Sequence, residues 1–430
     1  MLKIINGVLW AFATVFLISM GIYYTYKLKF VQFKFKDMFK NLFKKTSRDS
    51  ISPFASLMMV LGGRIGVGSV AGIAIAIYYG GVGSIFWMWL VGLITVPLSF
   101  AEVVLGVKYK ERDGKYFKGG PSYYLKKGVK NKKLGNIYAF LIIFSYVGGF
   151  LGIQSNTITK SLTTFVTVEP LVVGLVISLI TFIIIIGGVK KISDACSKIV
   201  PLMTLLYVVT ALYIVLLNIN SVPLILLNIF KQAFDFKSLG FGLFGSIVIG
   251  IQRGIFSSEA GLGTGAIASS TTDNNPVNQG LVQMLGVYIT TFLVCTSTAI
   301  IILTANNNLN LVDVNGIEIT QMAFIKHLGS LGNYIVFISI ILFAFSTILS
   351  GYYDGEASIK YFNKGKKSLN LLKVISLIVI FFGSFLSSNF LWNLVDILTA
   401  LLAIINVYAV FVLRHEVIDE YTNYNKCDKI

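Results

Sequence analysis

GGRIGVGSVAG, residues 62–72, lies at the centre of an apolar stretch that runs from Ile51 to Tyr79. The stretch is long and apolar enough to cross a lipid bilayer. Its centre nevertheless holds five glycines and Arg64, and glycine weakens helices and exposes backbone polar groups. Irregular backbone is tolerated at membrane depth only where protein or a watery cavity surrounds it. The sequence therefore predicts two half-helices with an unwound joint near Gly66 to Ser69.

A joint of this kind has a chemical consequence. It leaves free N–H groups at the start of the second half-helix and free C=O groups at the end of the first. The first set attracts a carboxylate and the second a cation. This pattern is typical of ion-coupled amino-acid transport.

The composition places the whole chain in a membrane. Of 430 residues, 55% are hydrophobic and 13% are charged, which predicts an all-α integral membrane protein. The formal net charge of +17 does not indicate a nucleic-acid partner, because the basic residues lie in short loops between apolar segments. The three cysteines stand far apart and the two histidines cannot form a metal centre, so no cofactor is expected.

Hydropathy predicts eleven transmembrane helices, the first of them a retained signal anchor. The predicted spans are 5–25, 52–80, 84–107, 137–160, 170–188, 196–218, 240–270 (interrupted), 278–304, 331–357, 371–388 and 390–413.

The first connection, Lys27 to Asp49, alternates phenylalanine with lysine (KFVQFKFKDMFKNLFKK). This mixture favours a helix in the membrane interface on the anionic leaflet. A solvated basic loop is the alternative.

Lysine and arginine placement predicts the orientation. Connections one, three, five and nine carry most of the basic residues, whereas the opposite loops carry little beyond Lys160, Lys231, Lys237 and Lys326. By the positive-inside rule the N-terminus is outside and the C-terminus cytoplasmic. A bias towards Ile, Lys and Asn fits a prokaryote with an AT-rich genome. The expected location is therefore the prokaryotic plasma (inner) membrane.

Without the first span, ten spans divide into two fives, and each five opens with an interrupted span. An odd number of spans per half predicts inverted repeats, with the binding site at the two broken helices. The expected organisation has four parts: an N-terminal helix with the basic interfacial helix (1–51), a first repeat (52–218), a second repeat (240–414) and a cytoplasmic tail (415–430).

Several motifs resemble those of the alanine or glycine:cation symporter family. In the first half these are GGRIGVGSVAG, GGVGSIFWMWL (80–90), FAEVVLGVKYK (100–110) and GGPSYYLKKG (119–128). In the second half they are QRGIFSSEAGLGTGAIAS (252–269), residues 278–303 and FAFSTILSGYYDGE (343–356). The resemblance implies a fold similar to the bacterial leucine transporter, with an extra N-terminal helix. It also implies symport of a small neutral amino acid with sodium, or less often with protons.

The expected substrate site combines both breaks. Free amides at Gly66, Gly68 and Ser69 would hold the substrate carboxylate, although these glycines could instead serve close helix packing. Carbonyls from Phe256 to Glu259 would accept from the ammonium. Gln154 is similar in place to a glutamine that lines the family's site, and a helix–helix hydrogen bond is its alternative role. The full set of substrate candidates is Gly66, Gly68, Ser69, Phe150, Gln154, Phe256, Ser257, Thr347 and Gly351.

The resemblance also implies a sodium site, because the related fold keeps one opposite the first broken helix. Ser346 and Thr347 would supply hydroxyl ligands. Carbonyls near Leu61, Gly62 and Ile65 would complete the site. The alternative is that both hydroxyls bond only to their own helical turn.

Charged residues at membrane depth are functional candidates. Arg64 is expected to pair with a carboxylate that the sequence does not identify. The candidates for gating or structural charges are Arg64, Arg253, Glu259 and Asp354.

The chain departs from the family pattern at three positions. Val67 and Ser69 stand where many members have threonine and asparagine. Gly351 stands where the family usually has a tryptophan that would close the pocket. The absence of this tryptophan favours a substrate larger than alanine, such as glutamine, unless another aromatic residue such as Tyr352 or Phe150 fills the gap.

Other function classes fit less well. A channel needs a continuous polar path, whereas the polar residues here cluster at two breaks. An intramembrane enzyme needs a nucleophile with a base, or a metal motif, and the sequence has neither HExxH nor GxSxG. Proton coupling would need a titratable group at the ion site, which Ser346 and Thr347 are not. The sequence leaves the oligomeric state open.

Overall fold

The computed structural model describes residues 2–44, 50–163, 165–234, 244–305, 316–362, 365–386 and 388–427. Parts of several predicted segments lie outside the described residues: the end of the first basic connection, Lys237, the start of the span 240–270, Lys364 and the end of the tail.

Helices dominate the described chain. The N-terminal part and first half contain α1 (Leu2–Lys27), η1 (Val31–Phe33), α2 (Phe35–Leu42), α3 (Pro53–Arg64), η2 (Val67–Ser69), α4 (Ala71–Gly80), α5 (Ser84–Lys108), α6 (Pro121–Lys127), α7 (Lys132–Ile142), η3 (Ile143–Phe150), α8 (Leu151–Thr163), α9 (Pro170–Ile185), α10 (Gly188–Leu217) and α11 (Val222–Ala233). A hairpin of β1 (Glu111–Asp113) and β2 (Tyr116–Lys118) precedes α6.

The second half contains α12 (Phe244–Ser258), α13 (Thr264–Ser269), α14 (Pro276–Val287), η4 (Tyr288–Cys295), α15 (Thr296–Ala305), α16 (Gly316–Leu328), α17 (Ser330–Tyr361), α18 (Lys366–Gly383), α19 (Ser388–Val412) and α20 (Arg414–Cys427). The segments η3 and η4 are π-helices that interrupt long α-helices.

Where its residues are described, each of the eleven predicted spans overlaps a helix or a run of consecutive helices. Seven described helices are long and apolar enough to cross a membrane, or eight if the bent pair α3–α4 counts as one span. The chain is therefore a multi-pass membrane protein. The count of eleven and the inverted repeat stay predictions.

The first broken helix has the predicted joint. Ser52 caps α3 by accepting a hydrogen bond from Ala55 N at 3.2 Å, and Pro53 takes the first helical position, which suits its fixed φ. After Arg64 the chain passes through η2 and continues as α4, with a 65° bend between the two halves.

The second break follows Ser258. Glu259 has a left-handed φ of 49°, and Gly261 and Gly263 have φ of 87° and 92°. Glycine adopts this region without steric cost, whereas glutamate does so with strain. Strained non-glycine residues concentrate at functional sites.

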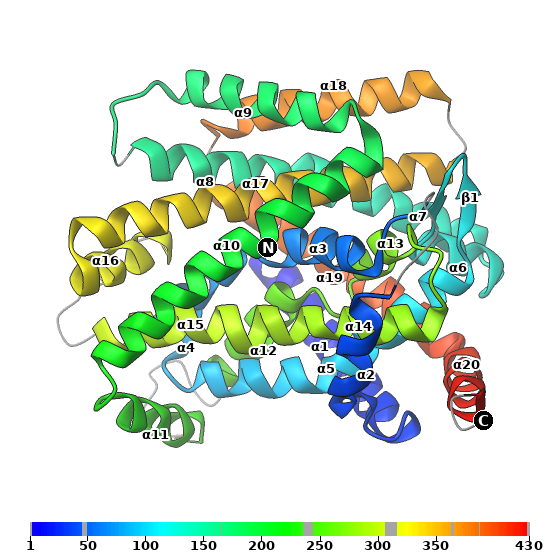
Figure 1. Cartoon of the computed structure of the whole chain (residues 1–430), viewed down its shortest axis with the longest axis horizontal. Coiled ribbons are helices and arrows are strands. Elements are labelled where there is room, and N and C mark those ends of the chain that lie inside the picture. Colours follow the sequence, from blue (N-terminus) through cyan, green and yellow to red (C-terminus); the bar gives the residue numbers. More distant parts are fainter. Residues whose placement is uncertain are drawn as a thin grey trace.

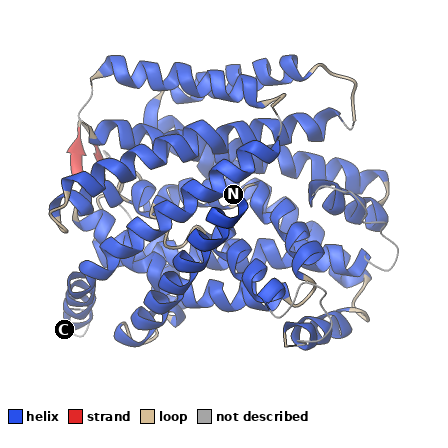
Figure 2. Ribbon diagram, turned by 180° about the vertical axis from the view of Figure 1, so that it is seen from behind, coloured by secondary structure: helices blue, strands red, loops and turns tan. Residues whose placement is uncertain are grey.

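The helices pack as a bundle with two distinct ends (Figure 1). The hairpin, α6 and α20 lie at one end, while α11 and α16 lie at the other. Between them α5 packs against α12 and α14, and α17 packs against α3, α8 and α10. Figure 2 shows the same bundle from behind, with the short hairpin at its edge.

Hydropathy did not predict the short elements α6, α11, α16, α20 and the hairpin. These segments are amphipathic or too short to register as membrane spans. The basic interfacial segment does contain a helix, α2, whose Met38 and Leu42 are buried while Phe35 and Phe39 are exposed.

Candidate functional site

The two helix breaks face a small cavity inside the bundle. Its lining comes from α3, the joint, η3, α8, α12 and α19, together with the second break, and comprises Gly63, Arg64, Gly66, Gly68, Phe150, Gln154, Phe256, Glu259 and Trp392. Five predicted substrate residues are among these: Gly66, Gly68, Phe150, Gln154 and Phe256.

Aromatic rings form a continuous column beside this cavity. Tyr146 stacks on Phe150 with ring centroids 4.7 Å apart, and Phe150 stacks on Phe256 at 5.8 Å. Trp392 continues the column at 5.7 Å from Phe256. The π-helix η3 presents the first two rings, α12 the third and α19 the fourth. The column screens the cavity with apolar faces and edges.

The joint of the first broken helix presents backbone amides. Ser69 N donates to Gly66 O and Val70 N to Val67 O, both at 3.1 Å. Among the described contacts, the N–H groups of Gly66, Val67 and Gly68 have no backbone acceptor. A Cβ at Gly68 would lie 3.0 Å from the Phe256 ring, so glycine is what allows this close approach.

Gln154 points its amide towards the joint. A Cβ at Gly66 would lie 3.5 Å from Gln154 Nε2. The side chain is buried, with 3% exposure, and its Oε1 has no hydrogen-bond partner among the described residues. A buried carbonyl oxygen without a donor is costly. The arrangement therefore offers an acceptor to a molecule in the cavity.

The hydroxyl pair on α17 lies against the first broken helix. Ser346 Oγ and Thr347 Oγ1 each lie within donating distance of two carbonyl oxygens, Gly62 O at 3.2 and 2.9 Å and Phe343 O at 3.0 and 2.9 Å, and each has one proton to share between them. Ile65 N donates to Leu61 O at 2.7 Å. The predicted sodium ligands thus lie on facing elements, and their oxygens are of the type that hard cations prefer. The contacts with Phe343 O lie within the same helical turn, and they correspond to the alternative role of these hydroxyls that the sequence left open.

Arg64 and Glu102 connect the two breaks. Arg64 Nη2 lies 3.9 Å from Glu102 Oε1 and donates to Ser99 Oγ at 3.0 Å. Glu102 Oε2 accepts from the backbone N–H of Gly261 and of Gly263, each at 3.1 Å. The carboxylate on α5 therefore holds the second break and neutralises the arginine of the first. Glu102 is the partner of Arg64 that the sequence did not identify.

Glu259 lies at the second break with its carboxylate inside the bundle. Its Oε1 accepts from Tyr146 Oη and its Oε2 from Thr264 Oγ1, both at 2.9 Å. Asp354 on α17 lies close enough to interact electrostatically with Glu259. Asp354 Oδ1 has no hydrogen-bond partner in the described part of the chain.

The charges of this region do not balance. Glu102, Glu259 and Asp354 are all buried, and Arg64 is the one cation with comparable burial among the described residues. Unpaired buried carboxylates are unfavourable. The site therefore favours a bound cation, an ammonium group or protons.

Four predicted substrate residues lie outside the cavity lining. Ser69 Oγ donates to Arg64 O within the joint, and Ser257 Oγ donates to Gly254 O in its own helix, each at 3.3 Å. Thr347 faces the joint from the side of the predicted sodium ligands, since a Cβ at Gly66 would lie 2.7 Å from its Oγ1. A Cβ at Gly351 would meet Leu151 Cδ1 at 3.2 Å and Tyr146 Cδ1 at 3.4 Å.

Arg253 lies beyond the aromatic column. Its guanidinium is 5.8 Å from the Phe256 ring centroid, and it interacts electrostatically with Asp396 on α19. These two charges connect α12 to α19 next to Trp392.

The sequence missed Trp392, Tyr146, Gly63 and the role of Glu102. An isolated tryptophan near the end of a span usually indicates a membrane-interface anchor. Nothing in the sequence around Trp392 therefore indicated that it lines a cavity. The π-helix that orients Tyr146 had no signature in the sequence either.

Comparison with known proteins gives consistent results. The sequence profile described as the sodium:alanine symporter family matches residues 1–430. A probable sodium/glutamine symporter, GlnT, of Bacillus subtilis is 37% identical over 436 residues, covering 99% of this chain and 91% of that protein. A sodium/alanine symporter, AgcS, of Methanococcus maripaludis is 34% identical, and the aligned region covers 99% of this chain and 97% of AgcS.

Among solved structures, a sodium-coupled sialic acid symporter in a substrate-bound outward-open state has a similar fold. The TM-score is 0.56 at 14% identity, covering 93% of this chain and 82% of that one.

Proposed function

Because the chain belongs to the sodium:alanine symporter family, we propose that it imports a small neutral amino acid together with sodium by alternating access. The relatives are transporters, and the protein is not an enzyme. The two inverted five-helix repeats, the outside N-terminus and the cytoplasmic C-terminus are part of this proposal.

One observation carries the proposal: both ends of an amino acid find complementary groups around one cavity. The free amides from Gly66 to Gly68 suit the carboxylate, since amides at a helix start bind anions. Gln154 Oε1 and the Glu259 carboxylate suit the ammonium, which donates but cannot accept hydrogen bonds. Such a substrate would satisfy the unpartnered amide oxygen and place its ammonium beside the Glu259 carboxylate, while the net negative charge would be left for the coupling ion to balance.

Sodium would bind between α3 and α17. Ser346 and Thr347 would turn their lone pairs to the ion, and carbonyl oxygens of Leu61, Gly62 and Ile65 would complete the ligand set. Gly66 lies between this site and the substrate cavity, because a Cβ there would reach both Thr347 Oγ1 and Gln154 Nε2. Ion and substrate would therefore stabilise the same conformation of the joint, which is a direct route to coupling.

The substrate class extends to glutamine. The glutamine-associated relative supports this extension. Gly351 lies outside the cavity lining, so it would act on the cavity only through its neighbours. Tyr146 and Leu151 border Gly351, so a tryptophan there would displace them rather than enter open space. We expect Gly351→Trp to reduce uptake of glutamine more than uptake of alanine; an unchanged ratio would contradict the size argument.

Proton coupling is the second candidate. It is favoured by Asp354, whose Oδ1 has no partner among the described residues and which lies near Glu259. A proton shared by this pair could replace or accompany sodium.

The test is uptake of radiolabelled alanine, glycine and glutamine into proteoliposomes. We expect accumulation with an inward sodium gradient and none when potassium replaces sodium. Accumulation driven by a proton gradient alone would reject sodium coupling in favour of the second candidate. Failure to accumulate any of the three amino acids would reject the proposed substrate class.

A further inference from the structure

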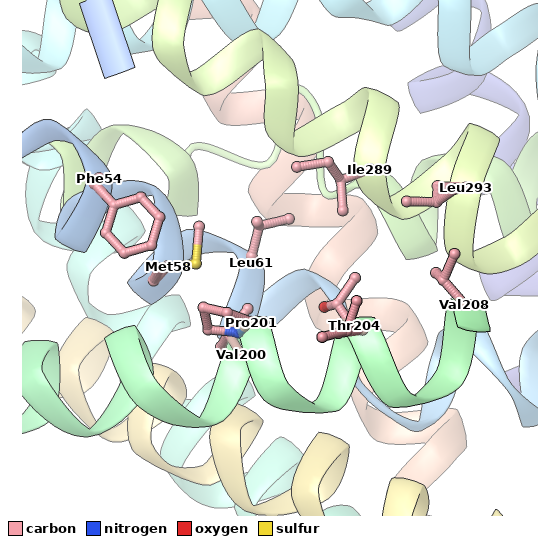
Figure 3. A pocket seen from close by; sticks show the side chains of 10 residues that line it. Phe54, Met58, Leu61, Val200, Pro201, Thr204, Val208, Ile289 and Leu293 are labelled. Atoms are coloured by element: carbon pink, nitrogen blue, oxygen red, sulfur yellow. The ribbon is translucent and has the colours of Figure 1, made fainter. Parts of the chain in front are cut away.

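A second cavity lies on the outer side of the first half-helix. It has a volume of about 290 Å³ and is formed by α3, α10 and η4. Figure 3 shows their side chains converging on it. Its lining comprises Phe54, Met58, Leu61, Val200, Pro201, Thr204, Leu205, Val208, Ile289 and Leu293.

This groove is apolar and open to the side of the bundle. Thr204 supplies its only side-chain hydroxyl. Leu205 is 64% exposed and Leu293 is 41% exposed, so the groove is not sealed by protein. In a membrane protein such a surface meets hydrocarbon rather than water.

The groove has the length of part of one leaflet. The lining runs from Phe54 to Leu61 on α3 and from Val200 to Val208 on α10. At about 1.5 Å per helical residue these walls are about 10–12 Å long. One leaflet contributes roughly 15 Å of hydrocarbon, so the groove is long enough to hold most of one acyl chain.

The amphipathic helix α2 adjoins the Phe54 end. Phe43, directly after α2, stacks on Phe54 with ring centroids 6.0 Å apart. Phe35 contacts Tyr288, the first residue of η4, at 5.0 Å. The interfacial segment therefore touches two of the three walls, which places this end of the groove at the membrane surface.

Two lysines without ion-pair partners in the described chain lie near the Phe54 end of the groove. Lys44 follows Phe43, and Lys198 lies on the face of α10 that continues through Pro201 and Leu205, by helical spacing. Both lysines are exposed, and neither has an ion-pair partner within the described chain. Cations at a membrane surface attract anionic headgroups.

We propose that this groove binds one anionic phospholipid. One acyl chain lies between α3, α10 and η4, and the phosphate lies between Lys44 and Lys198. The bound lipid braces α3, whose last turn contains Leu61, so it contacts the half-helix that carries the proposed sodium ligands Leu61 and Gly62.

The test is native mass spectrometry of the purified full-length protein with added phosphatidylglycerol or phosphatidylcholine. We expect wild type to retain one phosphatidylglycerol in preference to phosphatidylcholine. The double variant Lys44→Gln/Lys198→Gln should lose about tenfold of that preference. The matched double variant Lys132→Gln/Lys133→Gln removes two exposed lysines elsewhere and should keep it.

A second pair of variants tests the acyl chain. Thr204→Phe adds bulk inside the groove and should reduce retention of the lipid, whereas Leu202→Phe adds bulk at a 60% exposed neighbour on α10 and should not. Equal retention by both members of either pair would overturn the proposal. Because the readout is lipid retention, a failure of the transport proposal would not alter it.

Discussion

Gln154 presents a buried amide oxygen to the cavity, and its replacement tests the substrate site at a single residue. Gln154→Leu removes the acceptor and shortens the side chain by one atom. We expect the KM for the transported amino acid to rise about tenfold, the effect of losing one hydrogen bond to a charged group. Uptake kinetics in proteoliposomes measure it. An unchanged KM would assign Gln154 to helix packing.

Glu102 is expected to be more important for stability than any surface acid. Glu102→Gln removes the charge opposite Arg64 and places an amide donor among the N–H groups of Gly261 and Gly263. Breaking a buried ion pair costs about 3–5 kcal/mol. We expect a clear drop in the midpoint of thermal unfolding in detergent.

The control for Glu102 is Asp194→Asn, which breaks an exposed ion pair with Lys190 at 2.8 Å. An exposed pair of this kind contributes under about 1 kcal/mol, so the midpoint should hardly move. Equal shifts for the two variants would contradict the role of Glu102 as the link between the breaks.

The first broken helix allows three glycines to be compared within one element. A Cβ at Gly66 would lie 2.7 Å from Thr347 Oγ1, and one at Gly68 would lie 3.0 Å from the Phe256 ring. A Cβ at Gly72 would have its nearest neighbour at 3.8 Å. We expect Gly66→Ala to weaken sodium dependence, Gly68→Ala to weaken substrate uptake and Gly72→Ala to be tolerated.

Uptake measured against sodium and against substrate concentration separates these effects. If Gly72→Ala impaired transport as much as Gly66→Ala, the glycines would act through general helix packing instead of through the joint.

At the scale of the whole molecule, cysteine labelling tests the orientation. Lys132 and Ser330 are exposed and start helices at opposite ends of the bundle, while Cys196 and Cys295 are buried. In a Cys427→Ser background, a membrane-impermeant maleimide should label Ser330→Cys on intact cells. Lys132→Cys should react only after permeabilisation. The reverse pattern would invert the topology, and labelling of both from outside would contradict the span count.

The sequence alone determined the membrane class, both helix breaks, the amphipathic α2 and most of the residues that line the cavity. It could do so because a bilayer fixes span length and hydrophobicity, and because irregular backbone is tolerated at membrane depth only where protein or a watery cavity surrounds it. Ser346 and Thr347 were predicted as sodium ligands for a different reason, the resemblance to a family, and this role stays a prediction.

Only the tertiary structure decided which groups meet. The pairing of Arg64 with Glu102, the place of Trp392 beside Phe256 and the charge excess around Asp354 each join helices far apart in the chain. Such contacts depend on packing and on π-helical turns, which leave no periodic signal in the sequence. The apolar groove against α3 is likewise formed by three helices together, and the sequence of no single helix predicts it.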